Sequence, residues 1–224
     1  METERVTVNF NRAIPVFPLP ACVLLPHAAV PLHIFEDRYR AMVHGALDGP
    51  GLIAMAVYDQ DARDGHSLRP VVCVGYLVQH DRLDDGRYHI LLHGVCRARI
   101  VEELPPHDDG YRMAKLQPFG LDQTATDDES SALHEVRERI RTLLKDPKLR
   151  KLGPVTQIDG WLEPSLPTSA LIDLVTLAVS PDPESRYACL AEEEPRRRGE
   201  ALTGILLGKK ASERGGQWQL ATGN

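Results

Sequence analysis

The clearest hydrophobic pattern in the chain has a helical period and covers residues 35–47. Apolar side chains recur every three or four positions and form one continuous stripe: Phe35, Tyr39, Met42, Val43, Ala46 and Leu47. Glu36 and Asp37 occupy the first turn, where negative charge suits the helix dipole. The segment Asp48-Gly-Pro-Gly51 ends the pattern. We therefore predict an amphipathic helix here.

After this helix the pattern becomes that of strands. The run Leu52–Tyr58 is apolar throughout, which is typical of a strand buried on both faces, and Pro70–Val78 is a second such run. From Tyr88 to Ile100 apolar and polar positions alternate, which predicts a half-buried strand. Its solvent-exposed face would carry the polar side chains Arg87, His89, His93, Arg97 and Arg99. Gly94 in the middle predicts a bulge or bend.

Prolines punctuate the extended segments that precede the helix. Ile14–Leu19 contains Pro15 and Pro18, which cannot donate to a sheet, so we expect this strand at a sheet edge or broken into pieces. The extended pattern continues from Val30 to Ile34, and Tyr111–Phe119 reads as one more strand. Five or six strands with one helix predict a small β-barrel over residues 1–119.

The period changes again beyond a polar, acidic boundary at residues 120–130. Helical stripes follow, with apolar residues at Leu133–Leu144, Leu171–Ala178 and Leu202–Leu206, and a short helix is expected after Asp182-Pro-Glu184. We predict a helical domain over residues 120–208. The polar segment 209–224 is expected to be a disordered tail.

Several motifs in this order resemble a known family. They are Phe17-Pro-Leu-Pro20, Pro31-Leu-His-Ile-Phe-Glu-Asp-Arg-Tyr-Arg40, Gly94-Val-Cys-Arg97 and, near the end, Asp173-Leu-Val. The region from about Ile14 to Gly208 is similar to the N-terminal substrate-binding domain of Lon proteases, which also occurs in cereblon. The resemblance implies an α+β fold, with a PUA-like small β-barrel followed by a C-terminal helical bundle. It also implies a role in recognising proteins.

Composition and charge narrow the function classes. The 224 residues carry a formal net charge of -6, which gives no general attraction to nucleic acid or anionic lipid. The sequence contains no apolar run long enough to cross a bilayer. The start Met-Glu-Thr-Glu-Arg lacks the features of a signal peptide. We therefore expect a cytoplasmic protein that does not bind membranes.

The residues do not predict an enzyme, a cofactor or a metal site. Gly204-Ile-Leu-Leu-Gly208-Lys-Lys210 departs from a phosphate-binding loop in spacing and lacks the final Ser or Thr. The four cysteines form no Cys-x-x-Cys pair. Cys22 and His27 lack a third orienting group. On a strand, His89 and His93 would lie about 13 Å apart, too far to share one ion.

Apolar recognition of polypeptide is the remaining hypothesis. The proline-rich segment could pair an extended chain by strand addition, with contacts from Phe17, Leu19, Leu24 and Leu25 and orientation by Arg38. The alternative is that the apolar residues close the barrel and receive the helix, the role we assign to Ile34, Phe35 and Tyr39, and that Arg38 pairs with a nearby Glu or Asp.

The hypothesis is a non-enzymatic module that binds unfolded or exposed polypeptide segments, as an adaptor or accessory to ATP-dependent proteolysis with a separate protease or chaperone. Two alternatives remain open. One is a PUA-like RNA-binding protein that uses Arg87, Arg97 and Arg99, and the other is a separately encoded subunit of a Lon-type protease.

Overall fold

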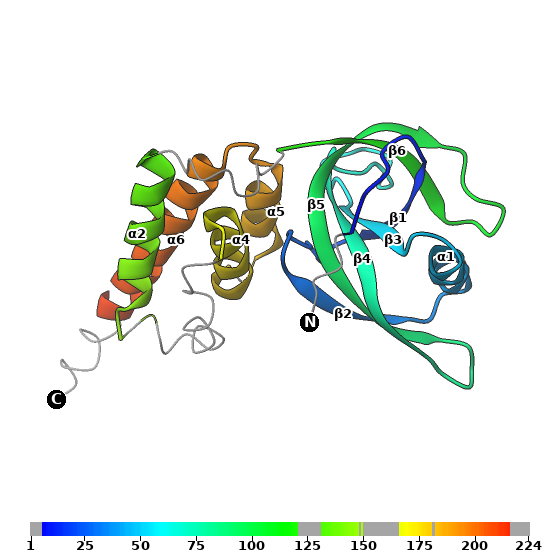
Figure 1. Cartoon of the computed structure of the whole chain (residues 1–224), viewed down its shortest axis with the longest axis horizontal. Coiled ribbons are helices and arrows are strands. Elements are labelled where there is room, and N and C mark those ends of the chain that lie inside the picture. Colours follow the sequence, from blue (N-terminus) through cyan, green and yellow to red (C-terminus); the bar gives the residue numbers. More distant parts are fainter. Residues whose placement is uncertain (1–5, 121–130, 148, 150–165, 181, 216–224) are drawn as a thin grey trace. The chain divides into compact units, whose positions relative to one another are not determined.

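The computed structural model describes residues 6–120, 131–147, 149, 166–180 and 182–215. Its internal contacts divide the chain into two compact units, Met1–Leu121 and Asp122–Asn224. The first unit contains the strands and one helix, and the second contains helices (Figure 1). The chain thus has a mixed α+β fold, and each unit is described separately below.

The first unit is built on a six-stranded sheet in the order β2-β5-β4-β3-β1-β6. Strand β6 pairs with β1 and also with β5. The hydrogen-bonded pairings therefore run from β5 through β4, β3, β1 and β6 back to β5. The strands are β1 (Ile14–Leu19), β2 (Ala29–Ile34), β3 (Leu52–Val57), β4 (Val71–Arg82), β5 (Tyr88–Leu104) and β6 (Arg112–Pro118). Helix α1 (Asp37–Leu47) lies between β2 and β3 in the sequence.

Strand β1 is not at a sheet edge, so that prediction is wrong. It pairs in parallel with β3 over Val16–Leu19 and antiparallel with β6 over Ile14–Val16. The two pairings overlap only at Val16. Pro15 is therefore paired with β6 alone, and Pro18 with β3 alone. A proline tolerates that position because its missing N–H can face the unpaired side.

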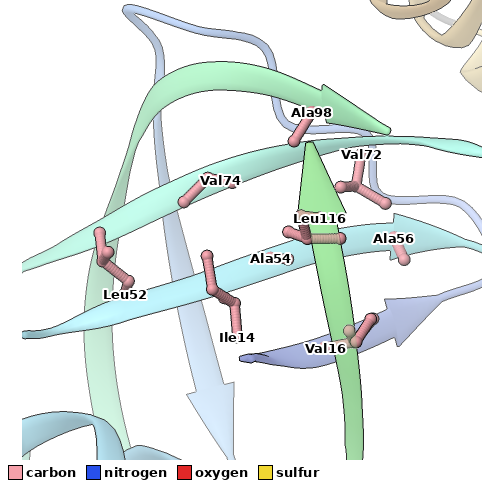
Figure 2. Packing of buried hydrophobic residues seen from close by; sticks show 10 residues of the cluster. Ile14, Val16, Leu52, Ala54, Ala56, Val72, Val74, Ala98 and Leu116 are labelled. Carbon is pink, nitrogen blue, oxygen red and sulfur yellow. The ribbon is translucent and has the colours of Figure 1, made fainter. Parts of the chain in front are cut away.

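The core of this unit is made of small aliphatic side chains that converge from five strands. Figure 2 shows nine of them pointing toward one another: Ile14, Val16, Leu52, Ala54, Ala56, Val72, Val74, Ala98 and Leu116. All six residues of β3 are buried, which confirms the prediction of a strand covered on both faces. Alternate residues of that strand, Leu52, Ala54 and Ala56, belong to this cluster.

A bulge in β5 corrects the predicted solvent-exposed face of that strand. Gly75 lies opposite Gly94 and Val74 opposite Cys96, so Val95 has no opposite residue on β4. An extra residue reverses the faces on which later side chains lie. His93 is therefore half-buried on one face, whereas Arg97 is only 2% exposed on the other, opposite the buried Cys73. The bulge that Gly94 predicts is present, but Arg97 does not lie on a solvent-exposed face.

Helix α1 begins after Glu36 and buries the predicted apolar side. Tyr39, Met42, Val43 and Ala46 are all buried. Phe35 precedes the helix and is 61% exposed, so our assignment of Phe35 to the core is wrong. The helical spacing includes Phe35 formally, but the backbone is helical only from Asp37 onward.

The second unit packs its helices through α6. The described helices are α2 (Ser131–Leu144), α4 (Thr168–Val179), α5 (Pro183–Ala191) and α6 (Pro195–Gly215), and α6 contacts both α2 and α4. The Asp182 carboxylate accepts from the Ser185 N–H at 2.7 Å and caps α5, whose first residue is Pro183. Helix α6 continues past Gly208, where we expected it to end, because a helical glycine costs only about 1 kcal/mol. Residues 216–224 of the expected tail lie outside the described residues.

Candidate functional site

The start of α1 brings two of the predicted site residues together. The Phe17 and Tyr39 ring centroids lie 4.5 Å apart in an edge-to-face contact, and the Arg38 guanidinium lies 4.4 Å from the Tyr39 centroid. Both aromatic residues are buried, whereas Arg38 is exposed. The result is a buried aromatic pair with an accessible cation at its outer side. Of these three side chains Arg38 is the accessible one, and its guanidinium can orient carbonyl or carboxylate groups.

The charged residues around this aromatic pair are held in place locally. Arg38 donates from Nη2 and Nε to the same carboxylate oxygen of Glu36, at 2.8 and 3.0 Å. Glu36 is the N-cap residue of α1, but its side chain forms no capping hydrogen bond. Exposed ion pairs of this kind contribute about 1 kcal/mol or less, so Arg38 can exchange Glu36 for a bound ligand.

Tyr39 remains uncharged across the physiological pH range. Burial raises the pKa of its hydroxyl to about 12, with a side-chain hydrogen bond to Tyr58 acting in the same direction and the Arg38 charge opposing it. A phenol in this state donates or accepts a hydrogen bond but does not act as a base at neutral pH. The Tyr39 hydroxyl is therefore not a candidate for proton transfer at neutral pH.

The remaining predicted site residues are less accessible. Leu24 and Leu25 are 2% and 0% exposed, and Leu19 at the end of β1 is partly buried opposite Val57. The segment that carries Leu25 packs on β5, where a side chain at Gly94 would overlap the Leu25 carbonyl oxygen. In this structure Leu24 and Leu25 occupy the core, the alternative role that we weighed for them. Phe35 and Arg38, by contrast, are exposed and accessible to a ligand.

The free edge of the described sheet is β2, which within the described residues pairs with β5 alone. Gly94 N–H donates to the Ala28 carbonyl at 2.8 Å. Because antiparallel hydrogen bonding alternates, the backbone groups of Ala29, Pro31 and His33 then face away from β5. Pro31 has no N–H to offer at the centre of this edge, which is a common protection against unwanted strand pairing. Strand addition along the whole of β2 is therefore disfavoured.

The predicted basic face for nucleic acid is not assembled. Arg97 is buried, and Arg99 lies over the Phe119 ring at 4.6 Å. Arg87 precedes β5 and is paired with Asp85 at 2.6 Å. The bulge at Val95 separates Arg87 from the other two arginines by a change of face.

One thiol and one histidine that we considered for chemistry have pKa values that burial shifts. Burial raises the pKa of the Cys96 thiol to about 11, so it remains protonated at neutral pH. Burial also lowers the pKa of His93. Across residues 6–120 and the described helices, no group of three or more His, Cys, Asp or Glu side chains could hold a metal ion.

The second unit contributes a surface hollow between α2 and α6, with a volume of about 350 Å³. Its lining includes charged residues of both signs and the apolar residues Val136 and Leu207. The Arg196 guanidinium in this lining is paired with Glu200 at 2.7 Å. Since these charges compensate one another, the hollow does not select a ligand of either sign.

None of the described helices is both long and apolar enough to cross a membrane.

Comparison with known proteins places these features in a family. Residues 13–208 match the family described as the ATP-dependent protease La (LON) substrate-binding domain. A Lon protease of Helicobacter pylori is 19% identical over 90% of this chain, and Lon protease 1 of Myxococcus xanthus is 26% identical over 88%. The chain spans about a quarter of the length of these relatives, 24% in both cases.

Two solved structures have the same fold. The N-terminal domain of the Mycobacterium avium complex Lon protease has a TM-score of 0.64 at 17% identity, over 87% of this chain and 98% of that chain. A Lon N-terminal domain protein from Xanthomonas campestris has a TM-score of 0.55 at 21% identity, over 86% and 98%. The family match covers most of the chain and the fold agrees with it, so the chain belongs to the Lon substrate-binding domain family.

Proposed function

We propose that this protein binds unfolded or exposed polypeptide segments through the surface at the start of α1 and acts as an adaptor or accessory to proteolysis. The observation that carries the proposal is the match of residues 13–208 to a substrate-binding domain. Phe35 just before α1 and Arg38 in its first turn are both exposed, and they supply apolar and charged contacts of the kind that a polypeptide needs.

The protein would perform this role without catalysis of its own. The family match that supports this is to a substrate-binding domain, and the chain spans about a quarter of the length of the Lon relatives. Cleavage of a bound polypeptide would then need a separate protease. We also interpret the ring of strand pairings through β6 as the small PUA-like barrel that the family resemblance implies, with the helices of the second unit forming the bundle.

The backbone groups along the β2 edge indicate how a polypeptide would be held. Because Pro31 removes a donor from the centre of the β2 edge, the ligand would be held mainly by side-chain contacts rather than by a continuous ladder of backbone hydrogen bonds. Apolar contacts of that kind depend weakly on salt, whereas binding to nucleic acid releases counterions and weakens steeply as salt increases.

A titration of the purified protein distinguishes these cases. Fluorescence anisotropy would follow a labelled, permanently unfolded polypeptide and a labelled RNA, each at low and at high salt. We expect polypeptide binding that changes little with salt. RNA binding that falls steeply with salt, without affinity for the polypeptide, would overturn the proposal and favour the RNA-binding alternative.

A further inference from the structure

Two histidines that are distant in the sequence face each other on the surface of the first unit. His33 in β2 lies directly opposite His89 in β5, and their ring centroids are 4.8 Å apart. Both side chains are exposed. Along β5 itself, His89 and His93 are spaced too far apart to share one ion. The antiparallel pairing instead brings His89 to His33 across the strands.

The backbone places this pair at the closer of the two spacings found in antiparallel sheets. The hydrogen bond from Gly94 N–H to the Ala28 carbonyl sets the alternation, and His33–His89 falls in a non-hydrogen-bonded pair. The Cα atoms of such pairs lie about 4.5 Å apart and their side chains share one face. Two imidazoles in this arrangement can direct one nitrogen each toward a common point.

The observed ring separation fits a shared metal ion. Histidine nitrogens bind zinc at roughly 2.0–2.1 Å, so two imidazoles on one tetrahedral ion have centroids about 5 Å apart. The observed 4.8 Å is close to this value without any change of backbone. Phe35 stacks on the His33 ring with a centroid distance of 6.1 Å and limits its rotation.

One contact of His33 competes with a metal ion. Arg87 Nη1 lies 3.1 Å from His33 Nε2, and since a guanidinium has only donors, this nitrogen accepts from Arg87 through the lone pair that an ion would use. Arg87 has a second partner, Asp85, at 2.6 Å. If the Arg87 side chain moves away from His33, it therefore loses one exposed contact, which contributes about 1 kcal/mol or less. Asp81 lies opposite His89 on β4 and partly offsets the Arg87 charge.

We propose that His33 and His89 form a two-histidine site for a divalent transition-metal ion of the zinc, copper and nickel class, with water in the remaining positions. Imidazole is a preferred ligand of these ions, whereas calcium and magnesium prefer oxygen. With two protein ligands the site is open and weaker than a closed structural zinc site. A bound ion would cross-link β2, which pairs with β5 alone in the described sheet, to its neighbour.

Calorimetric titration of the full chain with Zn²⁺ tests the site. We expect His33→Gln and His89→Gln each to weaken the strongest binding step at least tenfold, because one remaining imidazole cannot chelate. The matched control is His44→Gln, since His44 is an exposed histidine on α1, and it should leave the affinity unchanged. Arg87→Gln should strengthen binding several-fold, because it removes both a competing donor and a like charge.

A second measurement needs no variant. Substoichiometric Cu²⁺ broadens the NMR signals of nearby protons, and the ring signals of His33 and His89 should disappear before those of the other histidines. Zinc binding that is unchanged in the His33→Gln/His89→Gln double variant would overturn the proposal, as would first broadening at other histidines. Either result would mean that the ion binds adventitiously elsewhere.

Discussion

At the scale of single residues, burial decides which candidates can contact a ligand. Leu24 and Leu25 look like exposed loop residues in the sequence, because prolines surround them and no periodic pattern includes them. In the structure they are core residues, whereas Phe35 and Arg38 are exposed. Sequence spacing could not tell the buried residues from the exposed ones. The burial of Leu25 depends on contact with β5, nearly seventy positions away in the sequence.

The substitution Leu24→Asp should destabilise the protein rather than remove a ligand contact. A carboxylate at a site that is 2% exposed would lose its hydration, and such substitutions cost about 4 kcal/mol or more. Urea denaturation measures the loss directly. Phe35→Ser is the control and should change the free energy of unfolding by about 0.5 kcal/mol or less, because Phe35 is 61% exposed. An equal, small effect of both substitutions would contradict the burial of Leu24.

The Cys96 thiol should react slowly with alkylating reagents at neutral pH. Its pKa is raised to about 11 by burial, so the thiolate is a small fraction below that pH and grows about tenfold per pH unit. A variant with the other three cysteines replaced by alanine isolates this group. The alkylation rate should rise continuously from pH 8 to pH 10. A rate that levels off at about pH 9, as for an ordinary thiol, would contradict the raised pKa and would reopen nucleophilic chemistry.

At the scale of strands and helices, the sequence predicts which elements form better than it predicts which strands pair with one another. The period of α1 and the continuous apolar run of β3 are local properties, and both elements are confirmed with nearly the expected bounds. The place of β1 between β3 and β6 depends on distant partners. Its prolines indicate an edge, but the sheet accommodates them by pairing each half of β1 on a different side.

The bulge at Gly94 should be intolerant of a side chain. A Cβ at this position would overlap the Leu25 carbonyl, so Gly94→Ala must move the backbone and should lower the free energy of unfolding by about 2 kcal/mol or more. Gly204→Ala in α6 is the matched control. A Cβ there meets no atom within 4 Å, so it should stabilise the helix by up to about 1 kcal/mol. Thermal or urea unfolding of both variants checks the opposite signs.

Pro31 should protect the β2 edge from association. Pro31→Thr restores a backbone N–H that faces away from β5 and adds a residue with high strand propensity. We expect increased self-association by sedimentation velocity, with the far-ultraviolet circular dichroism unchanged. The control Ala29→Thr keeps an existing N–H at the same edge and should have less effect. Equal association of both variants would show that the missing donor of Pro31 does not protect the edge.

At the scale of the whole molecule, the two units divide the sequence where its period changes. Contacts separate Met1–Leu121 from Asp122–Asn224, and the helical stripes begin beyond that division. The family could be inferred from the order of motifs around Pro31 and Arg40, and the match over residues 13–208 shows it. The proposed binding surface could be inferred only in part, because Arg38 is a candidate from the sequence but the exposure of Phe35 is not evident from its spacing.

The most direct test of the central claim compares two double variants for affinity to a labelled unfolded polypeptide. The first is Phe35→Ser/Arg38→Ala, at the start of α1. The second is Val101→Ser/Lys115→Ala, which removes a hydrophobic residue of similar exposure (60% against 61%) and a cation that is likewise held in an exposed ion pair. We predict at least a tenfold loss of affinity for the first variant, about 1.4 kcal/mol, and no change for the second. Wild-type affinity in the first variant would contradict the assignment of the binding surface to the start of α1.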